Sequence, residues 1–436
     1  MLNEMRRYLL LIAILPAFGQ QAQPVPAVNA PITISFQEAL DRARKYGLEI
    51  QSANIAALLA REDRIQAKAA MLPGVQYFNQ FIYTQPNGTP SGVFVANDGP
   101  HIYNSQGQVH EDLSWARRAE YRRAMAAEVV ARAKADVTAR GIIATVVQDY
   151  YAVAIAQRRL ANAQRNLEDA RKFLDITQKQ ERGGEAAHAD VVKAEVQVEQ
   201  RQRDASDAQL GIDKARLALA VIIFPDFRQD FTVVDDLDQL SPLASFKEVQ
   251  ELALAKSPEL RAAQANLQQG QADISVARTG YLPALSLDYF YGIDANQVAI
   301  YNRDHEKNLG SVAQATLTIP VWTWGATQSK VRQAELKQKQ AQLELTFAQR
   351  QLMANLNSFY QEAQLAHTQL DSLRKSMDLS AESLRLTLLR YESGEANALE
   401  VVDAQTTLAQ ARNAYDDGRS RYRIALAAIQ TLTGNL

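Results

Sequence analysis

Apolar residues recur at alternating spacings of three and four positions through two long stretches of the chain, which is the seam pattern of helices packed in a coiled coil. The seams comprise Leu160, Ala163, Leu167, Ala170, Leu174 and Thr177 in the first half, and Leu370, Leu373, Met377, Ser380, Leu384, Thr387 and Tyr391 in the second. Between Trp115 and Arg182 there is no proline and the only glycine is Gly141. The pattern therefore predicts one helix over 115–182, about 100 Å long.

Two segments between the helical stretches follow the two-residue period of β-strands instead. In the segment 285–321 the alternating apolar positions are Leu285, Leu287, Tyr289, Tyr291 and Ile293, followed after a loop by Ala313, Ala315, Leu317, Ile319 and Val321. The segment 75–113 is rich in Tyr, Phe, Val, Asn and Gly, with turn residues at 85–88 and 97–100. We therefore expect β-hairpins at 75–113 and 285–321, each with one apolar face and one face for water.

The whole pattern occurs twice, with an offset of 210 residues. The segment 180–194 returns as 390–404, where Gly, Glu, Ala, Val, Val and Ala recur in register. Other matching pairs are Phe36 with Phe246, Leu72-Pro73 with Leu282-Pro283, Tyr150 with Tyr360 and Leu160 with Leu370. Since such scarce residue types would not align by chance, the chain is predicted to contain two copies of one structural unit.

Each unit is predicted to contain a helix, a hairpin, a long helix and a returning helix. The first repeat, 35–240, has its long helix at 115–182 and its returning helix at 187–224, and the second repeat, 241–436, has them at 325–392 and 397–433. The opening helix from Ser35 to Met71 is interrupted near Gly47. Laid end to end, the opening and returning helices would match the long helix, which suggests a cylinder wall of alternating continuous and stacked helices.

The N-terminus has the layout of a secretory signal peptide. Arg6 and Arg7 precede an apolar core from Tyr8 to Leu15, and small residues follow around Ala22. We assign residues 1–22 to the signal and 23–34 to a mobile leader. Because the sequence contains no cysteine, neither a disulfide framework nor a lipid-anchored thiol is expected.

The composition excludes several kinds of chemistry. The formal net charge is −2, and without a basic cluster a nucleic-acid role is not indicated. The five histidines show neither metal-binding spacing nor cysteine partners, so no metal site is expected. Nucleotide-binding and nucleophile motifs are missing from the sequence as well. We therefore predict no cofactor, no catalytic residue and no enzymatic activity.

Aromatic residues gather where the strands meet the helices. They are Tyr77 and Trp115 in the first half, and Tyr281, Trp322 and Trp324 in the second. This placement is typical of the interfacial girdle of a membrane β-barrel. A soluble β-sandwich is the alternative, but four strands are few for a sandwich and the flanking helices are long.

The order of these features resembles the TolC-like outer membrane efflux proteins, from about Ser35 to Leu436. The resemblance implies a mainly helical trimer in which each chain gives four strands to a 12-stranded outer-membrane β-barrel, continuous with a long periplasmic α-helical barrel. Physical reasoning agrees, since four strands cannot close around a lumen and an open edge in lipid would leave backbone amides unpaired.

The implied function is passive conduction from the periplasm to the exterior of a diderm cell, in a tripartite efflux or type I secretion system. The implied partners are a periplasmic adaptor, an inner-membrane pump of the RND, ABC or MFS type, and outer-membrane lipid. A periplasmic adaptor would instead require a lipoyl-like all-β domain. A structural coiled-coil protein of the envelope would leave the strand alternation unexplained.

The resemblance also implies roles for residues at the two helical turns. The turn residues Gly183, Gly184, Glu185, Ser393, Gly394 and Glu395 correspond to the surface on which an adaptor docks. Glu400 and Asp403 match an acidic ring near the tunnel entrance, although a solvated outer face would explain them too. Tyr391 and Asp190 match a gate contact, whereas Ala396 replaces an arginine that adds gate bonds in the family. Alternatively, Tyr391 extends the apolar seam and Asp190 caps a helix.

Overall fold

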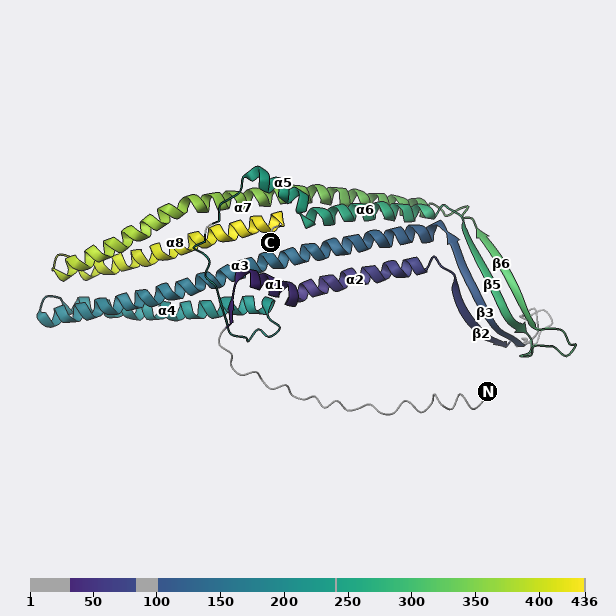
Figure 1. Ribbon diagram of the computed structural model, residues 1–436, viewed down its shortest axis with the longest axis horizontal. Coiled ribbons are helices and arrows are strands. Elements are labelled where there is room, and N and C mark those ends of the chain that lie inside the picture. The colour runs from purple at the N-terminus through teal and green to yellow at the C-terminus, as the bar shows by residue number, and fades with distance from the viewer. Residues whose placement is uncertain (1–31, 84–100, 240, 435–436) are drawn as a thin grey trace, which may run out of the picture.

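The computed structural model describes residues 32–83, 101–239 and 241–434, which form an elongated molecule with helices along most of its length and a β-sheet at one end (Figure 1). The assigned signal peptide 1–22, most of the leader and the turn residues of the first hairpin lie outside the described residues. No helix among the described residues has the length and apolar character required to cross a bilayer.

Two long helices, α3 (Trp115–Gly183) and α7 (Ala326–Glu392), run from the sheet to the far end of the molecule (Figure 1). The shorter helices are α1 (Phe36–Tyr46), α2 (Leu48–Ala69), α4 (His188–Ile223), α5 (Phe246–Lys256), α6 (Pro258–Thr279) and α8 (Ala398–Thr433). Helices α2 and α4 follow each other along α3, and α6 and α8 follow each other between α3 and α7. The expected wall of continuous and stacked helices is therefore present.

The opening helix of each repeat is interrupted, for local chemical reasons. Gly47 separates α1 from α2, and a Cβ atom at this position would lie 2.5 Å from the carbonyl oxygen of Ala43. In the second repeat Ser257 ends α5 and caps α6, with Pro258 at the first helical position. Ser35 and Ser245 cap α1 and α5 in the same way, each accepting from a glutamate N–H three residues on.

The four long strands form one antiparallel sheet. They are β2 (Gly74–Tyr83), β3 (His101–Ser114), β5 (Ala284–Ala295) and β6 (Leu309–Thr318), in the spatial order β2-β3-β5-β6. The hairpins β2-β3 and β5-β6 are joined by β3-β5 pairing, which places Ser114 opposite Ala284. The returning strand was expected to reach Val321 but ends at Thr318, just before Ile319 and Pro320. Because a proline has no N–H to donate, it does not continue the ladder.

The sheet has one polar and one apolar face, as the alternation predicts. On the polar face His110 lies opposite Asp288, and Nδ1 of the histidine is 2.7 Å from Oδ1 of the aspartate. On the other face Val109 lies opposite Tyr289 and Leu113 opposite Leu285. The apolar face includes one acidic residue, Glu111, near the helical end of the strands.

Near the middle of α3, two short strands from the beginning and the end of the first repeat pair with each other. Strands β1 (Ile32–Ile34) and β4 (Phe231–Val233) pair in parallel, 199 residues apart. The assignment of 23–34 to a mobile leader is wrong for residues 32–34, because Ile34 is fully buried in the core around Tyr150. A short strand near residue 231 was expected, but its partner was not.

Equivalent contacts recur in the two repeats, which supports the predicted duplication. The ring of Phe36 meets Tyr150 edge-on at 5.4 Å, and Phe246 meets Tyr360 at 5.1 Å. The Tyr150 hydroxyl donates to the carbonyl oxygens of Val234 at 2.8 Å and Ile34 at 3.4 Å. Tyr360 donates to the carbonyl of Ala244, the residue equivalent to Ile34, at 3.2 Å.

Candidate functional site: the two helical tips

The turns α3-α4 and α7-α8 lie side by side at the end of the molecule farthest from the sheet (Figure 1). Each contains one glycine in the left-handed conformation, Gly184 and Gly394, both with φ of +77°. The backbone bonds match as well, since Glu185 N donates to Gln180 O and Glu395 N to Arg390 O, both at 2.8 Å. This bonding satisfies the last carbonyls of each long helix and lets the chain reverse sharply.

The predicted docking residues are exposed at these turns. Gly183, Gly184 and Glu185 on the first tip, and Ser393, Gly394 and Glu395 on the second, all lie at the surface. Gln180 ties the tips together, because its side-chain amide donates to the carbonyl oxygen of Tyr391 at 3.3 Å. The two turns thus form one paired exposed surface that includes the carboxylates of Glu185 and Glu395.

The two returning helices begin differently. Asn397 and Glu400 form a capping box at the start of α8, in which Asn397 Oδ1 accepts from Glu400 N at 3.1 Å and Glu400 Oε1 accepts from Asn397 N at 3.3 Å. Helix α4 follows Ala187, which provides no side-chain cap, and Asp190 is the acidic residue of its first turn. The two tips are therefore held by different local bonds, since at the first tip His188 Nδ1 lies 2.7 Å from Glu181 Oε1.

Tyr391 is buried between the tips, in the last turn of α7. Its ring meets Phe173 of α3 edge-on at 5.2 Å, and its hydroxyl donates to Oγ1 of Thr177 at 3.3 Å. Thr177 in turn donates to the carbonyl oxygen of Phe173 at 2.9 Å. Burial raises the pKa of the Tyr391 phenol, the Thr177 bond works against that rise, and the charge of Asp190 adds to it. The phenol is therefore protonated at neutral pH and acts as a donor.

The expected pairing of Tyr391 with Asp190 stays a prediction. Within the described chain the phenol donates to Thr177 instead, because Phe173 and Thr177 lie one turn apart on the face of α3 against which the ring packs. The Asp190 carboxylate is partly exposed and lies 3.9 Å from the Lys193 ammonium. Sequence analysis placed Thr177 in the apolar seam and missed its hydroxyl, although a threonine at the end of a leucine seam was the available signal.

The two residues of the predicted acidic ring differ in their surroundings. Glu400 is held by the capping box, and its other oxygen lies 3.4 Å from Nη1 of Arg390. Asp403 lies one turn further along α8 and is exposed. Only Asp403 therefore presents a carboxylate that no local cap engages, while Glu400 has a structural role that sequence analysis did not assign. Their place around a lumen stays a prediction.

A charge network, also missed, links α3, α8 and the inter-repeat connection. Arg158 of α3 donates to Asp235 at 2.9 Å, to Asp238 at 3.0 Å and to Asp416 of α8 at 3.0 Å. Only the acidic residues of the inter-repeat connection stood out in the sequence as possible members of this network. Asp416 is buried, whereas Asp235 and Asp238 are exposed. Because removing Arg158 would deprive the buried Asp416 carboxylate of this partner, the contact holds α8 against α3.

Nothing in the described part of the chain suggests bond-making chemistry. No group of three or more metal-ligating side chains occurs among the described residues. The candidate site consists of exposed turns above a small buried contact. Such an arrangement can bind a partner and hold two helix pairs together.

Comparison with known proteins agrees with this geometry. The family model of the outer membrane efflux protein matches residues 249–435. The cobalt-zinc-cadmium resistance protein CzcC of Cupriavidus metallidurans is 27% identical over 68% of this chain and 67% of its own length. The outer membrane protein TolC of Vibrio cholerae is 24% identical over 69% of each chain.

The fold also matches solved channels. The structure of the CmeC outer membrane channel of Campylobacter jejuni covers 92% of this chain and 85% of its own, with a TM-score of 0.80 at 16% identity. At that identity the likeness concerns the fold, which is the fold of trimeric outer membrane channels. Together with the sequence relatives, it shows that the chain is similar to the outer membrane efflux proteins in sequence and in fold.

Proposed function

We propose that three copies of this chain form the outer membrane channel of a tripartite efflux or type I secretion system. The four-stranded sheets would close a 12-stranded barrel in the membrane, and the helices would continue it as a tunnel through the periplasm. The tunnel has no energy source of its own. A periplasmic adaptor and an inner-membrane pump would therefore drive solutes into it.

This proposal rests on the two flanks of the chain, each of which has, among the described residues, a sheet edge without a neighbouring strand and a row of exposed apolar side chains. Strands β2 and β6 are each paired on one side within the described sheet. On the same two flanks, exposed apolar residues follow one spacing, seven positions and then four. They are Leu48, Ile55 and Leu59 on α2, and Leu336, Leu343 and Phe347 on α7. Sheet edges and apolar seams of this kind call for a partner on each side.

The internal duplication indicates which partner. Subtracting 210 from Leu343 gives Ala133 of α3, and adding 210 to Ile55 gives Ala265 of α6, and both alanines are buried. Helices α3 and α6 pack together inside the chain. The α7 flank of one copy should therefore pack against the α2 flank of the next as α3 packs against α6. Such a head-to-tail contact closes into a ring.

The orientation of the helical tips toward the periplasm can be tested in cells by crosslinking. With the sheet in the outer membrane, the tips would lie about 100 Å away and face an adaptor. We expect a cysteine at Ser393 to crosslink to the cognate adaptor, whereas a cysteine at Asn302, in the β5-β6 loop, should not. Crosslinks from Asn302 alone would mean that the molecule is oriented the other way.

The predicted acidic ring is testable by electrophysiology. In planar bilayers, Glu400→Gln combined with Asp403→Asn should lower cation selectivity and the sensitivity to blocking multivalent cations, because a narrow lumen would lose six carboxylates. Glutamine is used because it can still cap α8. Asn397→Ala is the control, since it weakens the same cap without changing charge. Equal changes in this control would assign the effect to a loosened tip.

A further inference from the structure

The chain is nearly neutral overall, yet one strong basic cluster lies where α3 leaves the sheet. Residues 115–123 contain Arg117, Arg118, Arg122 and Arg123 and a single acid, Glu120. The expectation that the chain lacks a basic cluster is therefore wrong for this stretch. Three copies in a trimer would concentrate these charges in a collar directly beside the barrel.

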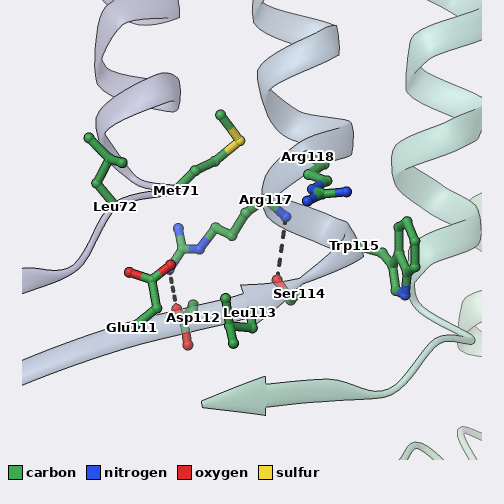
Figure 2. Close-up of a pocket in the computed structure, with 9 residues that line it drawn as sticks. All are labelled: Met71, Leu72, Glu111, Asp112, Leu113, Ser114, Trp115, Arg117 and Arg118. Carbon is green, nitrogen blue, oxygen red and sulfur yellow. Dashed lines mark hydrogen bonds and ion pairs between the residues drawn. The ribbon is translucent and has the colours of Figure 1, made fainter. Parts of the chain in front are cut away.

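The arginines of this collar are not equivalent. Arg117 turns back toward the sheet and donates to Asp112 at 2.6 Å, while Glu111 lies on the same side (Figure 2). Arg123 pairs with Glu120 at 3.0 Å. Neither Arg118 nor Arg122 makes an ion pair with any residue that the structure describes. These two guanidinium groups are therefore available to an external anion.

Arg118 and Arg122 share one face of α3 with Trp115. Their spacing of three and then four residues places the three side chains along a single helix stripe. The Arg118 guanidinium lies 5.8 Å from the centre of the exposed Trp115 ring. Figure 2 shows Trp115 and Arg118 on the side of the helix away from Glu111 and Asp112. Glu111 and Asp112 nevertheless line the same pocket as Trp115 and Arg118, next to Arg117.

The stripe opens toward the apolar face of the sheet. Leu72 and Leu113, both exposed, line a hollow of about 490 Å³ together with Trp115 and Arg118. That volume lies within the range of small-ligand pockets, about 300–1,000 Å³. Leu113 belongs to the face that carries Val109, Tyr289 and Leu285, on which Glu111 is the one acidic residue. Side chains that suit lipid tails and side chains that attract anions therefore meet at one level.

We propose that Arg118 and Arg122 bind the phosphate groups of anionic phospholipids in the leaflet next to the helices, while Trp115 and Leu113 contact the glycerol and upper acyl region. Tryptophan side chains are favoured at the membrane–water interface, and arginine near a membrane surface attracts anionic lipid. The inference rests on the sheet standing in the outer membrane. It assigns to this chain a preference among lipids, in addition to conduction.

The test is lipid binding by the purified trimer in a neutral detergent. Phosphatidylglycerol and phosphatidylcholine with identical acyl chains are added, and bound lipids are counted by native mass spectrometry. Wild type should bind phosphatidylglycerol more tightly than phosphatidylcholine. Replacing both Arg118 and Arg122 by glutamine should reduce the affinity for phosphatidylglycerol about 25-fold, because each arginine contributes about fivefold. Added salt should weaken the preference, because the contact is electrostatic.

Two further variants make the result decisive. Arg182→Gln with Arg203→Gln removes the same charge far from the sheet and should leave the preference intact. Trp115→Ala should weaken the binding of both lipids equally. A wild type without preference, or an equal loss in the distant variant, would overturn the proposal. Because the collar variant should keep wild-type channel conductance, failure of lipid binding would be distinguishable from failure of the channel itself.

Discussion

Replacing Leu343 and Phe347 by aspartate should abolish the trimer. These side chains are 64% and 67% exposed in the single chain, so they add little to the core of one copy. In the proposed ring they meet the α2 flank of the next copy, where each apolar side chain would contribute about 1.5–3 kcal/mol. Two carboxylates buried in each of three seams would reverse that contribution. We expect more than a tenfold loss of trimer by size-exclusion chromatography in detergent.

A control and a rescue separate lost assembly from misfolding. Gln342→Asp with Gln349→Asp adds the same charge at exposed polar positions of α7 and should leave the trimer intact. Adding Ile55→Lys and Leu59→Lys to the damaged chain should restore part of the trimer, because lysines on the α2 flank would then face the new aspartates. A trimer that withstands the aspartates would place the interface elsewhere.

Those features of the fold that repeat along the chain were predictable from sequence. The two-residue period around Tyr289 indicated the strands, and the seam around Leu167 indicated the long helix. The offset of 210 residues indicated two equivalent units, which the matching contacts of Tyr150 and Tyr360 support. Each of these signals is local or periodic, so it can be recognised without knowledge of the tertiary contacts between helices and strands.

Features that depend on one specific distant partner were not predictable. Strand β1 is three residues long and becomes ordered only by pairing with β4, so its sequence alone resembles a leader. The Arg158 network joins three segments, of which only the acidic one stands out in the sequence. Thr177 fits an apolar seam by spacing, and only the packed structure reveals its hydroxyl as the acceptor for Tyr391.

The gate hypothesis depends on what the Tyr391 phenol does when three copies assemble. In the described chain it bonds Thr177 across the two tips, over the buried ring of Phe173. The Asp190 carboxylate is close enough to influence the phenol electrostatically. We propose that a rearrangement of the tip on assembly lets the phenol donate to Asp190 instead. A phenol–carboxylate bond contributes about 1–3 kcal/mol, and three symmetric copies would act together.

Tyr391→Phe with Asp190→Ala should therefore raise single-channel conductance in planar bilayers and make cells leaky to large antibiotics, without lowering the amount of trimer. The ring of phenylalanine keeps the contact with Phe173, so only the hydroxyl and the carboxylate are lost. Thr177→Val is the matched control, because it removes the acceptor within the chain and keeps the side-chain volume. If the valine variant reproduces the full increase, the Thr177 bond closes the tip and Asp190 does not. Normal conductance in the double variant would place the closure at another contact.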